Sequence, residues 1–105
     1  MNRNFFQSLP DVPAGEEVFE PFIESETFFV ERIVSNNSVP PKEGWYEQSQ
    51  DEWVMVIQGS AVLEFENQTV ELHSGDTYLI KAMTKHKVAY TSSNPVCVWL
   101  AVHSK

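Results

Sequence analysis

From Trp45 onward, short apolar segments alternate with turn signals, and this feature limits the fold more than any other. The strand candidates are EWVMVI, SAVLEFE, TVELH, TYLI, HKVAYT and VCVWLAVH, and the turn signals between them are Gly59, Asn67-Gln68, Ser74-Gly75-Asp76 and SSNP. Short segments with a two-residue period and frequent turns are typical of β-strands, and no segment has the period of a long helix. The pattern predicts an all-β sandwich or barrel.

The first part of the chain gives weaker signals. FFVERIVS has strand composition, with Val30, Arg32 and Val34 on one face and Glu31 and Ile33 on the other. Before it, three prolines within the first thirty residues indicate an irregular arm, and EEVFEPFIE has room for no more than a turn or two of helix because of its proline. We therefore expect one domain, in which residues 1–27 form an arm that packs on a barrel of residues 28–105.

Composition excludes several classes of protein. The chain has 105 residues, a net charge of −8 and only seven Lys and Arg residues, which form no run, so nucleic acid and anionic membranes are not expected partners. No apolar run reaches the roughly 18 residues that span a bilayer, and the start lacks a secretory segment. The single cysteine, Cys97, lies in an apolar run and is expected to be a buried, inert thiol. These features predict a cytoplasmic location.

Glu52, Gly59, Gly75 and His86 stand at informative intervals in the second half of the chain. Their spacing resembles that of the cupin superfamily. Cupins are described by two motifs, G-x5-H-x-H-x3/4-E-x6-G and G-x5-P-x-G-x2-H-x3-N. Glu52 and Gly59 match the end of the first motif, and Gly75 and His86 match the second at the right interval. The segments ERIVS, WYEQSQDEWV, SGDTYLIKAMTKHKV and VWLAVH are also similar to a group of small single-domain cupins. The resemblance covers about residues 28–103 and implies a jelly-roll barrel, the double-stranded β-helix, with the arm outside it.

The sequence departs from both motifs at the positions that matter for chemistry. The two motif histidines would fall at Trp45 and Glu47 or, in the shorter spacing, at Tyr46 and Gln48, and neither choice supplies a histidine. In the second motif, the proline, glycine and asparagine positions hold Lys81, Met83 and Tyr90, respectively. The resemblance therefore implies a metal site reduced to Glu52 and His86, with Glu47 as the third candidate ligand.

Alternation of side chains along a strand places the two matched residues in the barrel. Glu52 would share the inner face with Val54 and Val56, and His86 would share it with Val88 and Tyr90. One His and two carboxylates suit Mn²⁺, Fe²⁺ or Zn²⁺, but Glu52 can equally pair with His86 or Arg32 without any metal. His73 is expected to be exposed, whereas His103, on the face of Trp99, either joins the barrel mouth or frays with the terminus.

These features leave three functions open. The first is a small-molecule pocket in the barrel, for which the candidate ligand-binding residues are Glu52, His86, Tyr90, Tyr46, Gln48 and Trp99. The second is a divalent-metal enzyme, an isomerase, lyase or oxygenase, that uses Glu47, Glu52 and His86. The third is a structural or partner-binding domain. A homodimer is expected in each case, because the arm is rich in Phe and a short barrel leaves sheet edges that need cover.

Overall fold

Eight β-strands form two antiparallel sheets. The computed structural model describes residues 3–38 and 44–105. The five-stranded sheet has the order β1-β2-β8-β3-β6 and the three-stranded sheet the order β5-β4-β7. The strands are β1 (Glu16–Glu24), β2 (Phe28–Asn36), β3 (Glu52–Gln58), β4 (Ser60–Phe65), β5 (Gln68–His73), β6 (Thr77–Ile80), β7 (His86–Thr91) and β8 (Cys97–Ser104). The predicted all-β fold is confirmed, and the described residues contain no helix.

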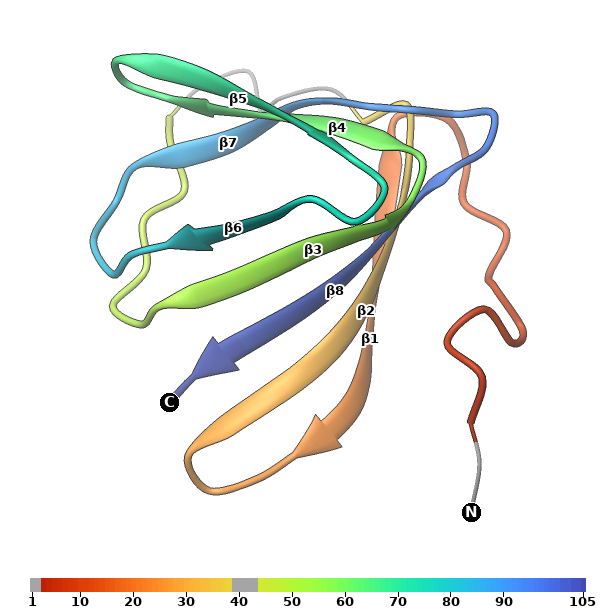
Figure 1. Cartoon of the computed structure of the whole chain (residues 1–105), viewed down its shortest axis with the longest axis horizontal. Coiled ribbons are helices and arrows are strands. Elements are labelled where there is room, and N and C mark those ends of the chain that lie inside the picture. Colours follow the sequence, from red (N-terminus) through yellow and green to blue (C-terminus); the bar gives the residue numbers. More distant parts are fainter. Residues whose placement is uncertain (1–2, 39–43) are drawn as a thin grey trace.

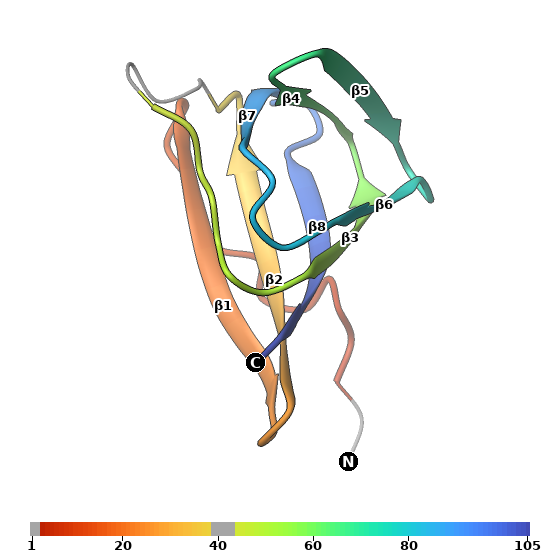
Figure 2. The same ribbon diagram turned by 90° about the vertical axis from the view of Figure 1, so that its left-hand side faces the viewer.

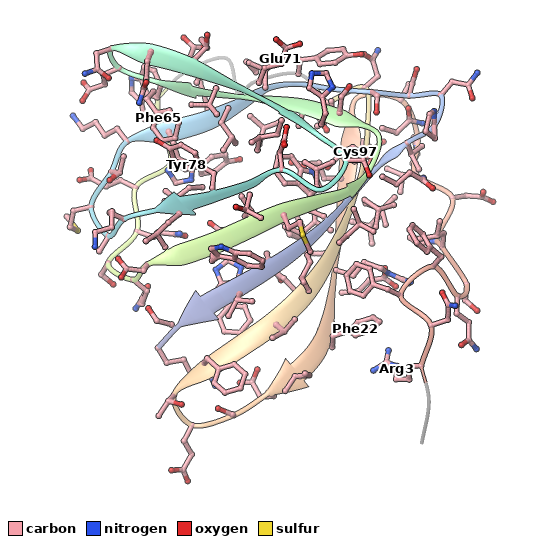
Figure 3. All side chains as sticks on the ribbon, in the orientation of Figure 1. Arg3, Phe22, Phe65, Glu71, Tyr78 and Cys97 are labelled. Atoms are coloured by element: carbon pink, nitrogen blue, oxygen red, sulfur yellow. The ribbon has the colours of Figure 1, made fainter. Side chains whose placement is uncertain are left out.

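The two sheets face each other and diverge from one end of the molecule. Figure 1 shows them meeting at the β3–β4 turn and spreading apart toward the start of β3 and β7. The main core lies between them, and its fully buried members include Val56, Ala61, Cys97 and Ala101. In the wider part, the rings of Phe65 and Tyr78 lie with their centroids 5.2 Å apart (Figure 3). The two sheets therefore lie closest at the β3–β4 turn.

The narrow end is closed by a close backbone approach at the β3–β4 turn. Gly59 has a φ of +82°, and a Cβ atom there would lie 2.5 Å from Ser92 Oγ and 3.0 Å from the carbonyl oxygen of Val96. Only glycine fits such a position without strain. Cys97 beside it is fully buried, as expected, and burial, together with the charge of Glu17, raises the pKa of its thiol to about 12. We call Gly59, Val56, Ala61, Thr91 and Cys97 the closed end.

Strand β2 separates two environments. Arg32 and Val34 face away from the space between the sheets, and the segment of residues 5–12 covers both of them on that side. Arg32 is 4% exposed, and its guanidinium donates to both carboxylate oxygens of Glu20 and to three carbonyl oxygens of residues 5–8. Glu31 and Ile33 lie on the inner face. The alternation predicted for this strand is therefore correct.

The expectation of helical turns in EEVFEPFIE was wrong, because this segment is strand β1. It pairs antiparallel with β2 as the edge of the larger sheet, and its register shifts between Pro21 and Ile23. Figure 2 shows β1 at the edge of this sheet. A proline is tolerated on an edge strand at a bulge, where no partner needs its N–H. Phe19 and Ile23 on β1 remain 58% and 52% exposed. The homodimer stays a prediction, as does the domain boundary after residue 27.

Candidate functional site

A pocket of about 400 Å³ opens between the sheets where they diverge. Most of its lining comes from seven of the eight strands, and the rest comes from the segment before β3. Its acidic residues are Glu17, Glu31, Glu47 and Glu52; its rings are Phe19, Tyr46, His86, Trp99 and His103; its other residues are Ile33, Gln48, Val54, Leu63, Ile80 and Val88. The floor is apolar and the polar groups converge above it, which is the usual character of a small-molecule site.

The segment before β3 is held against β7 by backbone hydrogen bonds. Tyr46 N–H donates to the carbonyl of His86 over 2.8 Å, and His86 N–H donates back to the carbonyl of Tyr46 over 2.9 Å. The carbonyl of Gln48 accepts from Met83 N–H over 2.7 Å. In Figure 2 this segment runs between β1 and β7, which are each an edge strand of one sheet. The pairing fixes the aromatic and amide side chains of the segment at one wall of the pocket.

The His86 side chain is buried, and one of its two ring nitrogens forms a hydrogen bond within the protein. The residue is 7% exposed, and Nδ1 lies 2.9 Å from the carbonyl oxygen of Thr84. Because a carbonyl oxygen only accepts, Nδ1 carries the proton in that bond, and the neutral ring then presents a lone pair at Nε2. Nε2 has no hydrogen-bond partner within the described parts of the chain. The imidazole therefore offers the pocket an acceptor.

Glu52, Glu31 and His103 form a polar cluster on neighbouring strands. Glu52 Oε1 accepts from the Gln48 amide over 2.9 Å, and its Oε2 lies 3.7 Å from His103 Nε2. The same ring nitrogen lies 2.8 Å from Glu31 Oε1, and Phe29 stacks on the His103 ring at 4.3 Å. Antiparallel pairing of β8 with both β2 and β3 brings these residues together. One imidazole thus serves two carboxylates.

Glu17 and Trp99 meet through a serine deeper in the pocket. Ser35 Oγ donates to Glu17 Oε2, and Trp99 Nε1–H donates to Ser35 Oγ over 3.2 Å. Burial raises the pKa of Glu17; the hydrogen bond from Ser35 opposes the shift, and the charge of Glu52 adds to it. Because the indole N–H already donates to Ser35, Trp99 presents only its apolar ring surface to the pocket.

Five of the six residues predicted to bind a ligand line the pocket, namely Glu52, His86, Tyr46, Gln48 and Trp99. Tyr90 does not, and its placement inside the barrel was wrong. The β4–β7 register pairs Leu63 with Val88 but Val62 with Tyr90, so Ala89 is an extra residue in β7. This bulge reverses the alternation beyond it. Tyr90 consequently lies outside at 45% exposure, and Thr91 is fully buried instead.

The candidate metal ligands Glu47, Glu52 and His86 line the pocket but do not form a ligand set. Within residues 3–38 and 44–105, no three His, Cys, Asp or Glu side chains are arranged to hold a metal ion. Gln48, at one of the motif histidine positions, donates its amide to the carboxylate of Glu52. A carboxylate oxygen that accepts one hydrogen bond can still bind a cation. The mismatch therefore lies in the arrangement, because the described side chains do not converge as the metal site that the motifs imply.

The sequence-based prediction of site residues left out Glu17, Phe19, Glu31 and, as a definite member, His103. The alternation along FFVERIVS already separated Glu31 from Arg32, and a barrel-mouth position was one of the two alternatives for His103. The pairing of Glu52 with Arg32 was wrong, because Arg32 faces the opposite side of the sheet and binds Glu20. His73 is 65% exposed, as expected.

Comparison with known proteins defines the family. A family model described as a cupin domain matches residues 38–103, more than half of the chain. The chain therefore belongs to the cupin family, and it is a small single-domain cupin. The comparison with curated proteins gives no match.

Solved structures agree with this assignment. A proposed mannose-6-phosphate isomerase from Ralstonia eutropha JMP134 is 39% identical, with a TM-score of 0.90 over 100% of this chain and 98% of that one. A cupin superfamily protein from Desulfitobacterium hafniense DCB-2 is 16% identical, with a TM-score of 0.77 over 98% and 90%. An RmlC-like cupin from Shewanella frigidimarina NCIMB 400 is 10% identical, with a TM-score of 0.75 over 98% and 87%. The last two show the fold alone.

One further property concerns membranes. Within the described residues, no helix has the length and hydrophobicity needed to cross a bilayer.

Proposed function

We propose that this cupin binds a small organic molecule in the pocket between its sheets and does so without a metal ion. The observation that carries the proposal is the unpartnered Nε2 of His86, on a residue that is 7% exposed and lines a cavity of about 400 Å³. A ring nitrogen that faces a cavity without a protein partner is available as an acceptor to a water or a ligand. An apolar floor with a few convergent polar groups gives the rest of a ligand site.

The alternative is a divalent-metal isomerase, lyase or oxygenase with Glu47, Glu52 and His86 as ligands. The proposed mannose-6-phosphate isomerase at 39% identity is the relative whose name suggests an isomerase. Phosphate recognition usually requires Arg, Lys or a helix N-terminus. Among the described residues, no Lys or Arg lines this pocket and no helix is present. Because no three described His, Cys, Asp or Glu side chains converge on a metal position, metal-independent binding is favoured. Because the described lining is acidic and has no Lys or Arg, a ligand other than a sugar phosphate is favoured.

A fragment screen on isotopically labelled protein tests the proposal. Protein purified without an affinity tag and treated with EDTA would be titrated with a mixed library of cationic, neutral and anionic fragments, with backbone amide shifts as the readout. Hits should shift residues 45–48, His86 and Trp99. Hits that map only to the β4–β5 turn, or binding that requires added Mn²⁺, Fe²⁺ or Zn²⁺, would overturn the proposal.

A further inference from the structure

The polar atoms that face the pocket are mostly hydrogen-bond acceptors. His86 commits its N–H to Thr84 and presents Nε2 as a lone pair. The Gln48 amide is committed to Glu52, and the Trp99 N–H is committed to Ser35. The N–H groups of His86 and Trp99 are thus consumed within the protein, and Gln48 keeps its second amide N–H. A ligand that satisfies this pocket must itself supply donors.

The charge of the lining is also one-sided. Four glutamates line the cavity, and within the described chain no Lys or Arg does. The one basic group in ion-pair range of these carboxylates, among residues 3–38 and 44–105, is the His103 ring, which serves both Glu31 and Glu52. The nearest buried arginine, Arg32, faces away and is fully engaged with Glu20 and backbone carbonyls. The pocket therefore carries negative charge that the protein does not neutralise.

Aromatic rings provide the third feature. Trp99 is 3% exposed and forms part of the inner wall, and Tyr46 and Phe19, both more than half exposed, stand at the mouth. The faces of such rings attract cations and pack against apolar groups. Carboxylates, free acceptors and ring faces all favour the same kind of ligand.

We infer that the pocket selects an organic ammonium compound, a primary amine in its charged form joined to an apolar body. This inference rests on the proposed function and adds the ligand class. The ammonium group lies between Glu52 and His86 Nε2, where its N–H groups satisfy both, and the apolar body lies over Val54 and Leu63 against Trp99. A carboxylate or phosphate ligand is rejected, because it would bring negative charge and further acceptors to Glu31 and Glu52.

The elevated pKa of Glu17 agrees with this assignment. Burial is its main cause, and the charge of Glu52 contributes. A bound cation would relieve the repulsion between these two carboxylates. A positively charged ligand would thus favour the charged form of both carboxylates.

Three probes with one carbon skeleton test the inference: 2-phenylethylamine, 2-phenylethanol and phenylacetate, each titrated into EDTA-treated full-length protein at neutral pH. Calorimetry and amide shifts give the affinity and the site. The amine should bind in the pocket at least tenfold more tightly than the alcohol, and phenylacetate should bind most weakly.

Matched variants separate charge recognition from structural damage. Glu52→Gln keeps an oxygen that accepts from the Gln48 amide, so the fold should persist while amine binding weakens about tenfold. The same variant should strengthen phenylacetate binding, a reversal that loss of structure does not produce. The control is Glu71→Gln, because Glu71 is 71% exposed on β5, away from the pocket (Figure 3), and it should change neither affinity.

The outcomes separate the inference from the proposed function. Pocket binding in which the alcohol or phenylacetate equals or exceeds the amine would overturn the ammonium inference and leave ligand binding intact. If none of the three probes binds and the fragment screen finds no pocket hit, both fail. An amine preference that Glu52→Gln leaves unchanged would also overturn the inference.

Discussion

The space between the two sheets has two unlike ends. At the closed end, Val56, Ala61, Thr91 and Cys97 are all fully buried, and the backbone approaches so closely that Gly59 has no room for a Cβ atom. At the open end, which we define as Glu31, Glu52, His86 and His103, the side chains are polar and surround a cavity.

The difference separates the source of stability from the source of specificity. Close packing at the closed end holds the sheets together, because filled interiors gain dispersion and exclude water. The open end contains carboxylates with little exposure and a ring nitrogen without a protein partner, groups that a ligand can bind. We therefore expect substitutions at the two ends to differ in kind, the first changing stability and the second changing binding.

The largest effect is expected at the β3–β4 turn. Gly59→Ala should lower the free energy of unfolding by about 2–5 kcal/mol, since a positive φ costs about 1–2 kcal/mol and overpacking about 1–3 kcal/mol more. Gly75→Ala is the matched control, because Gly75 has a φ of +91° but no atom lies within 4 Å of a Cβ there. This variant should lose only the stability that the positive φ costs. Equal losses in urea unfolding would show that the closed end is not tightly packed.

Trp99 lies where the two ends meet, and it should affect both properties. Trp99→Phe removes the hydrogen bond to Ser35 and some packing, so we expect a loss of about 1–3 kcal/mol in stability and severalfold weaker binding of 2-phenylethylamine. Trp53→Phe is the control, since Trp53 alternates with pocket-facing Glu52 and Val54 on β3 and does not line the cavity. Weaker binding in the Trp53 variant would contradict the division between pocket and surface.

A smaller, pH-dependent effect is expected at Glu17. Because burial raises its pKa in the folded protein, Glu17 in the unfolded chain ionises first as the pH rises above 4.5, and wild-type stability falls until the folded carboxyl also ionises. The glutamine in Glu17→Gln cannot ionise, so its stability should not fall over this pH range. The difference in unfolding free energy between variant and wild type should therefore grow with pH and become constant once the folded carboxyl of the wild type has ionised. Thermal unfolding of both proteins from pH 4 to pH 8 measures this difference in stability. A difference in favour of the variant that shrinks with rising pH would contradict a raised pKa of Glu17.

Much of the fold was predictable because its signals are local. Alternation along FFVERIVS and TVELH and the turns at Gly59 and Gly75 need no knowledge of distant residues. Strand β1 was missed because Pro21 argues against a central strand, and the sequence does not reveal that the strand lies at an edge with a bulge beside the proline.

The candidate site was predictable only in part, because its remaining members depend on pairing between distant strands. Glu52 and His86 follow from motif spacing. The contact between Glu31 and His103 depends on the register of β2 against β8, which no local pattern specifies. Tyr90 was misplaced because the single extra residue Ala89 inverts the alternation, and nothing in HKVAYT distinguishes a bulge from a regular strand.

The central claim, that the open end offers acceptors to a ligand, is tested most directly by the tautomer of His86. Long-range ¹H–¹⁵N correlation of the imidazole nitrogens at pH 8, in metal-free protein, reports which nitrogen carries the proton. The account predicts a protonated Nδ1 bonded to Thr84 and a bare Nε2 whose signal moves when 2-phenylethylamine is added. A protonated Nε2 in the free protein, or an Nε2 signal that does not respond to bound amine, would contradict it.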